Sequence, residues 1–167
     1  MTYANALWQL DQANLLSDEK CKVPVKSFIR LASEDSNYHA SAHYRSKDAG
    51  DKCKGEIFMS ASQYQKYCSP KFSHEHIVPV EVIYNLLLKT KCREKGDFEA
   101  ILRKFSIRAT ITRKENRMLS RSTMPEGFLK PGHDLYHDPF ARYIKAGINK
   151  NLERLTQASW VIQNNIE

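Results

Sequence analysis

The sequence of 167 residues lacks any apolar run approaching the roughly 20 residues that span a lipid bilayer. Its N-terminus, Met1-Thr-Tyr-Ala-Asn-Ala-Leu-Trp, has neither the basic start nor the long apolar stretch of a signal peptide. Internal repeats, low-complexity tracts and Pro- or Gly-rich linkers are also absent from the sequence. These absences argue against a membrane partner and predict one domain over 1–167, cytoplasmic unless it is exported by a route without such a signal.

No Cys-x-x-Cys pair occurs among the four cysteines. Without a sign of an oxidising compartment, free buried thiols are expected. A structural zinc site is an alternative, although the spacing of its candidate ligands is long and irregular. Those candidates are His39, His43, Cys53 and Cys68.

Basic residues are concentrated in one part of the chain. Residues 89–121 contain eleven Lys or Arg and four acidic residues, which accounts for the whole net charge of +7. A concentrated basic segment is typical of a protein that binds a phosphate backbone, although it can also be a solvated helix surface. The candidate nucleic-acid contacts are Arg108, Arg113, Lys114, Arg117 and Arg121.

The spacing of apolar residues predicts a mainly helical part over 1–70 and further helices around two strands. Helices are expected over 3–18, 24–32, 61–68, 80–90, 98–106, 139–147 and 149–166. Strands are expected over 57–59, 72–78 and 107–112, with loops over 33–55 and 122–139. Asp97 is expected to cap the helix over 98–106, and Thr112 with Glu115 has the spacing of a capping box.

The run Ser-His-Glu-His-Ile-Val-Pro-Val-Glu at 73–81 carries the most chemical information. It places the Glu75 carboxylate beside the His76 imidazole, with His74 on the other side. A carboxylate can bind a divalent cation, and a neutral imidazole can take a proton from water. The alternative is that these are exposed strand residues near a turn.

This run resembles the first motif of the HNH, or ββα-metal, nucleases, in which an acidic residue and a histidine precede Ile-Val-Pro. Glu115-Asn116 resembles the second motif, whose asparagine holds the catalytic loop in the family. The resemblance implies that Glu75 binds the metal, with His74 as a further candidate, and that His76 is the general base. The sequence departs from the family in one respect, because 40 residues separate His76 from Asn116.

The family places a last metal ligand on the helix after the second strand, where Gly-His-Asp-Leu-Tyr-His-Asp-Pro-Phe-Ala-Arg-Tyr occupies 132–143. His137 is the first choice for this ligand and His133 the second. Arg142 is a candidate to hold a phosphate, because its planar fork matches phosphate oxygens. An interior salt bridge between Arg142 and Asp138 is the alternative.

The resemblance thus implies an α+β fold, mostly helical, with a ββα-metal core over 72–148 and a helical insertion over 80–106. It implies an endonuclease that hydrolyses double-stranded DNA with one magnesium or manganese ion. A palindromic target would require a homodimer, and a role as a toxin delivered into a target cell would require an acidic immunity protein. Cleavage of RNA by the same site and non-catalytic DNA binding are the alternatives.

Overall fold

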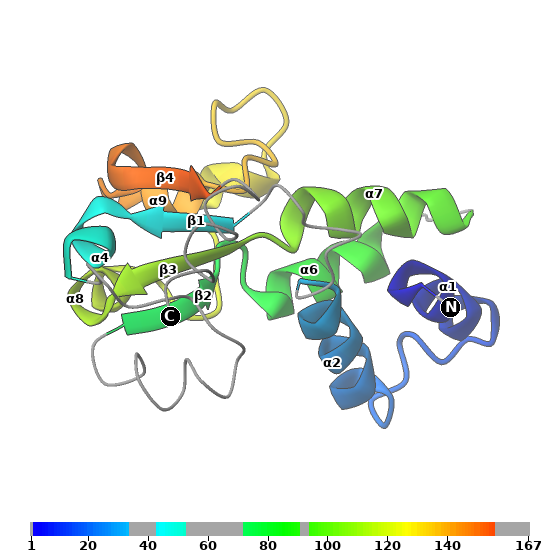
Figure 1. The fold of residues 1–167 in the computed structure, drawn as a ribbon. Coiled ribbons are helices and arrows are strands. Elements are labelled where there is room, and N and C mark those ends of the chain that lie inside the picture. Colours follow the sequence, from blue (N-terminus) through cyan, green and yellow to red (C-terminus); the bar gives the residue numbers. More distant parts are fainter. Residues whose placement is uncertain (1, 34–42, 53–71, 91–93, 156–167) are drawn as a thin grey trace, which may run out of the picture.

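The computed structural model describes residues 2–33, 43–52, 72–90 and 94–155. Within them the chain is α+β and forms two lobes, one of helices and one built around a small mixed sheet (Figure 1). No helix in these ranges is long and apolar enough to cross a membrane. The expected α+β class is therefore confirmed.

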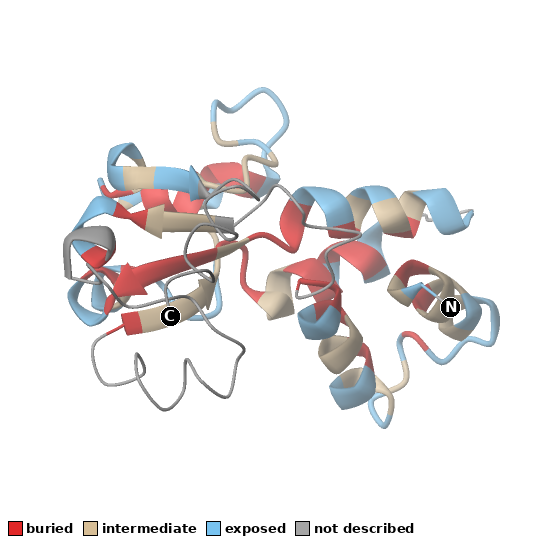
Figure 2. Cartoon of the chain, viewed as in Figure 1, coloured by how far each residue is buried: buried red, intermediate tan, exposed pale blue. Residues whose placement is uncertain are grey.

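Four helices form the helical lobe, and their buried side chains share one core. Phe98, Leu102 and Phe105 are three or four residues apart and lie on one buried face of their helix. Ile83, Tyr84 and Leu87 are buried on the preceding helix, as its apolar sequence predicts. Figure 2 shows the buried parts of these helices in red. The helices are α1 (Tyr3–Gln12), α2 (Lys22–Ala32), α6 (Val80–Lys89) and α7 (Lys95–Phe105).

The helices predicted over 24–32, 80–90 and 98–106 are thus confirmed, and the one over 3–18 is too long. It ends at Gln12 because Asn14 adopts a left-handed backbone conformation with φ of 56°, which stops a helix. Asp97 is not the cap of α7. The helix begins at Lys95, and the Asp97 carboxylate accepts a hydrogen bond from the Glu94 backbone N–H at 3.1 Å.

The second lobe contains four strands in the order β2-β3-β1-β4. β2 pairs antiparallel with β3, β3 pairs parallel with β1, and β1 pairs antiparallel with β4. The strands are β1 (His43–Ser46), β2 (Phe72–His76), β3 (Arg108–Thr112) and β4 (Leu152–Leu155). The short helices of this lobe are α4 (Lys47–Lys52), α8 (Arg113–Met118), η1 (Glu126–Leu129), α9 (Ala141–Lys145) and η2 (Asn149–Asn151).

The two strands predicted over 72–78 and 107–112 are confirmed as β2 and β3, and α9 lies inside the helix predicted over 139–147. Two other predictions are wrong. The loop expected over 33–55 contains β1 and α4, and the helix expected from 149 begins as η2 and β4. Both errors have one cause: β1 and β4 pair with each other across more than 100 residues, and local spacing carries no sign of a distant partner.

The strand predicted over 57–59, the helix over 61–68 and the end of the C-terminal helix lie outside the described residues. So do three of the four candidate zinc ligands and the side chain of His43, although the backbone places His43 on a strand. Cys21 is a free thiol and is half-buried.

A buried carboxylate fastens the sheet lobe at the end of β3. Glu115 is 4% exposed, and its Oε2 accepts hydrogen bonds from the Thr112 backbone N–H and the Thr112 hydroxyl, both at 2.8 Å. The Ser46 hydroxyl at the end of β1 donates to the same oxygen at 2.7 Å. The predicted capping box of α8 is therefore confirmed, and its acid also joins β1 to β3.

Replacing Glu115 tests this fastening. Glu115→Ala leaves buried donors of Ser46 and Thr112 without their shared acceptor, so we expect the free energy of unfolding in urea to fall by about 3 kcal/mol. Glu126→Ala is the control, because its side chain is 82% exposed and its ion pair with Lys130 lies on the surface. Equal losses in the two variants would contradict a structural role for the buried network.

Candidate active site

The candidate site lies on the last three residues of β2, where the chain leaves the sheet for α6 and the helical lobe (Figure 1). β2 is at an edge of the described sheet. Side chains alternate along a strand, so His74 and His76 lie on one face, and Ser73 and Glu75 lie on the other. The carboxylate and the candidate base are therefore adjacent in sequence and project to opposite sides of β2.

On the first face, Glu75 meets the guanidinium of Arg142. Arg142 comes from α9 and is only 3% exposed, and its Nη2 lies 3.0 Å from Glu75 Oε1. The Glu75 side chain is 22% exposed. Arg142 is the one hydrogen-bond partner of this carboxylate among the residues that the structure describes, and it contacts Oε1.

Arg142 also donates to backbone carbonyls on both sides of the site. Its Nε and Nη2 lie 3.3 and 3.1 Å from the carbonyl oxygen of Ile77, and the fork also reaches the carbonyls of His76 and Ser120. These contacts fasten the end of β2 and the loop after α8 to α9. Arg142 is buried, and the carboxylate it pairs with is Glu75, whereas the alternative interpretation expected Asp138. Asp138 accepts a hydrogen bond from the Phe140 backbone N–H at 2.8 Å.

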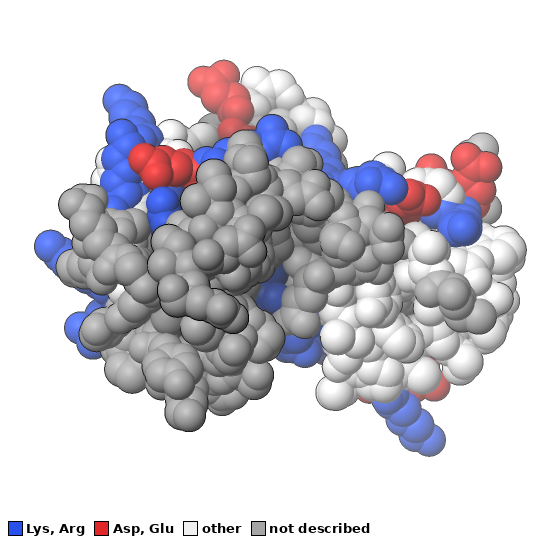
Figure 3. Space-filling view, viewed as in Figure 1, with Lys and Arg blue, Asp and Glu red and all other residues white. Residues whose placement is uncertain are grey.

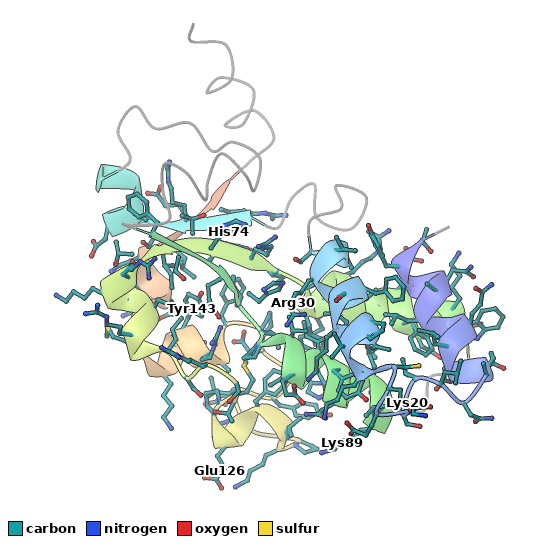
Figure 4. The ribbon with its side chains drawn as sticks, turned by 90° about the horizontal axis from the view of Figure 1, so that it is seen from below. Lys20, Arg30, His74, Lys89, Glu126 and Tyr143 are labelled. Carbon is teal, nitrogen blue, oxygen red and sulfur yellow. The ribbon has the colours of Figure 1, made fainter. Side chains whose placement is uncertain are left out.

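On the second face, both histidines have serine or threonine partners. His76 Nε2 lies 3.0 Å from the hydroxyl of Ser33, which is fully buried at the end of α2. His74 Nδ1 lies 3.0 Å from the hydroxyl of Thr110, its neighbour on β3. Figure 4 shows His74 on the sheet and Arg30 at the end of α2 that approaches it, so this face receives side chains from both lobes.

Asn116 reaches β2 from α8. Its side-chain amide donates to the Ser73 hydroxyl at 2.9 Å, on the same face of β2 as Glu75. The antiparallel pairing of β2 with β3 brings α8 back to the strand, although α6 and α7 lie between them in the chain. The structure therefore places Asn116 beside the strand that carries the candidate base, with Ser73 as its partner.

The two other candidate metal ligands lie in the loop before α9. The His137 ring stacks on Tyr136 at 4.2 Å and meets the edge of Phe105 at 5.8 Å. Burial, and to a smaller extent the charge of Lys104, lowers the pKa of His137, which favours the neutral form that binds metals. His133 is exposed, and its Nδ1 accepts from the Leu135 backbone N–H at 3.0 Å.

Within 2–33, 43–52, 72–90 and 94–155, no three His, Cys, Asp or Glu side chains come together as a metal site. This finding concerns sets of three side chains and does not test a pair such as Glu75 with His137 or His133, so the role of both histidines as ligands stays a prediction.

The basic segment is divided by β3. Arg108 lies directly across from His76 in the β2–β3 pairing. Arg113, Lys114 and Arg117 are exposed on α8, beside the Phe72 end of β2, about 13 Å along the strand from His76 at ~3.3 Å per residue. Arg103 and Lys104, in the last turn of α7, lie toward the other end of β3, and Figure 3 shows Lys and Arg over both ends of the face drawn.

Comparison with known proteins gives no match to any family model, curated protein or solved structure. The interpretation of the site therefore depends on its own geometry and on the motif that β2 carries.

Two partners in this site, Ser33 and Thr110, were not predicted from the sequence. Thr110 follows from the β2–β3 register once both strands are predicted, because its position pairs with His74. Ser33 carries no comparable signal, since it lies at the end of a helix 43 residues away from His76.

Arg142 is the group that a conservative substitution tests best. Lysine keeps the charge but lacks the planar fork, so Arg142→Lys leaves several buried carbonyls without donors. We expect the free energy of unfolding to fall by roughly 3 kcal/mol and the melting temperature by roughly 6 to 12 °C. Arg117→Lys, on the exposed side of α8, should melt with the parent protein. Identical melting of the Arg142→Lys variant and the parent would contradict the buried fork.

Proposed function

We propose that this protein is a divalent-metal-dependent endonuclease of the HNH type that hydrolyses DNA phosphodiester bonds. One observation carries the proposal: a carboxylate and an imidazole on consecutive residues of β2 project to opposite faces of a strand in an antiparallel pair. The helix that follows this pair, α8, returns Asn116 to β2. The order of strand, helical insertion, strand and helix supports a ββα-metal core over 72–148 with α6 and α7 as the insertion.

The carboxylate of Glu75 suits a hard divalent cation. Magnesium is commonly held by one or two carboxylates, with waters and substrate phosphates as its other ligands. The partly exposed Glu75 carboxylate, with Arg142 on Oε1, fits that role. An ion bound there would supply stabilisation of the negative charge on the phosphate and on the leaving oxygen. His137, His133 and His74 are the proposed sources of a second ligand.

His76 is the proposed general base. Its ring is half-buried at the end of β2, next to the Ser33 hydroxyl, and a neutral imidazole can take a proton from a water as that water attacks phosphorus. Asn116 and Arg142 hold the strand that carries it, through Ser73 and through the carbonyls of His76 and Ile77. Because Arg142 is only 3% exposed, its role in the proposal is to position Glu75 and β2.

The distribution of charge favours a long polyanion as the substrate. Arg108 lies across from His76, and the exposed cations of α8 with Arg121 extend the positive surface away from it. A duplex carries regularly spaced phosphates over such a distance, so several of these side chains can contact one molecule. DNA binding alone would not require a carboxylate and an imidazole side by side on β2.

The direct test is incubation with plasmid DNA and, separately, with structured RNA, in magnesium, manganese or EDTA. We expect cleavage of DNA that EDTA abolishes, and His76→Ala should lose at least about a hundredfold in rate while it still binds DNA. Preferential cleavage of RNA would change the substrate but keep the site. DNA binding without cleavage in any metal would contradict the proposed function and favour a binding protein.

A further inference from the structure

Among the residues that the structure describes, the hydroxyl of Ser33 has two polar neighbours, and together they determine where its proton lies. Ser33 Oγ is 2.5 Å from the carbonyl oxygen of Arg30 and 3.0 Å from His76 Nε2. A carbonyl oxygen can only accept, and two oxygens this close repel unless a proton lies between them. The single hydroxyl proton of Ser33 therefore points at Arg30.

The contact with His76 must then run in the opposite direction. Since the Ser33 proton is used, Oγ offers only lone pairs to the imidazole, and Nε2 carries the hydrogen that it donates. In a neutral imidazole one nitrogen is protonated and the other is not, so Nδ1 holds the lone pair. This assignment follows from the heavy-atom geometry around a residue that is fully buried.

We propose that Ser33 is a positioning residue that holds His76 as the Nε2–H tautomer, so that Nδ1 is the nitrogen that takes the proton from water. The proposal rests on the proposed nuclease function. As the water oxygen bonds to phosphorus and the bond from phosphorus to the leaving oxygen breaks, the water proton moves to Nδ1. The imidazolium that results still donates from Nε2 to Ser33 Oγ.

The position of Ser33 suits the charge that His76 acquires. It is the residue after α2, and its backbone N–H bonds to the Arg30 carbonyl at 3.0 Å. The carboxyl end of a helix carries a partial negative charge, which favours a nearby cation. An imidazolium at Ser33 therefore faces a hydroxyl oxygen and the end of the α2 dipole.

The helical lobe keeps Ser33 in place relative to β2. α2 packs against α6, and three residues separate α6 from the end of β2. Lys26 of α2 forms an ion pair with Glu81 of α6, and its ammonium also lies 5.5 Å from the centre of the Tyr84 ring. The N-terminal helices thus contribute to the site directly, through one hydroxyl on one imidazole nitrogen.

The test is nitrogen NMR of the protein labelled with ¹⁵N-histidine, which distinguishes the two tautomers without any substrate. His76 in the parent protein should be the Nε2–H tautomer, and Ser33→Ala should give a mixture. Ser33→Thr keeps the hydroxyl and should restore the parent tautomer. Ser27→Ala is the matched control, because the Ser27 hydroxyl donates to the Val23 carbonyl at 3.1 Å on the exposed side of the same helix.

Cleavage rates complete the test. We expect Ser33→Ala to lower kcat by about ten- to a hundredfold with little change in KM, and Ser33→Thr to recover most of it. A parent spectrum with the Nδ1–H tautomer would overturn the inference whatever the activity, and it needs no variant to fold. The parent protein and its variants could all fail to cleave nucleic acid while the His76 tautomer still depends on Ser33. That result would contradict the proposed function but leave the positioning of His76 by Ser33 in place.

Discussion

The buried guanidinium of Arg142 is the interaction on which the site depends. Five hydrogen-bond contacts from one side chain reach the Glu75 carboxylate and the carbonyls of His76, Ile77 and Ser120. Those carbonyls lie at the end of β2 and in the loop after α8. A buried charge of this kind is tolerable only when its donors are satisfied, so Arg142 and the carbonyl groups of His76, Ile77 and Ser120 stabilise each other.

This arrangement also explains how one short strand can hold two chemically different groups. Arg142 neutralises part of the Glu75 charge and orients the carboxylate from the α9 side of the sheet. His76 lies on the other face of β2, where Ser33 from the helical lobe meets its ring. Each lobe thus contacts one of the two groups. Arg142 of the sheet lobe positions the Glu75 carboxylate, and Ser33 of the helical lobe orients the His76 imidazole.

The sequence predicted those helices and strands whose signals lie within their own residues. The apolar spacing of α6 and α7, the alternation of β3 and the Thr112–Glu115 capping box were all read correctly. β1 and β4 were not, because β1 is polar and both strands exist through pairing with distant parts of the sheet.

The candidate site shows the same division between local and distant information. His74, Glu75 and His76 are consecutive, so a motif identifies them. The partners that give these residues their properties come from far along the chain: Arg142 lies 67 residues from Glu75, and Ser33 lies 43 residues from His76. No spacing rule connects such pairs, and only the folded chain shows that Arg142 is an interior group that supports Glu75.

Metal binding by Glu75 is the central claim, and a calorimetric titration with manganese measures it without any substrate. Glu75→Gln keeps the shape of the side chain and removes its charge, whereas Glu126→Gln makes the same change on the exposed η1 turn. The parent protein and Glu126→Gln should bind one manganese ion with equal affinity, and Glu75→Gln should weaken that binding by at least about tenfold. Equal manganese affinity in all three proteins would contradict the assignment of Glu75 as the metal ligand.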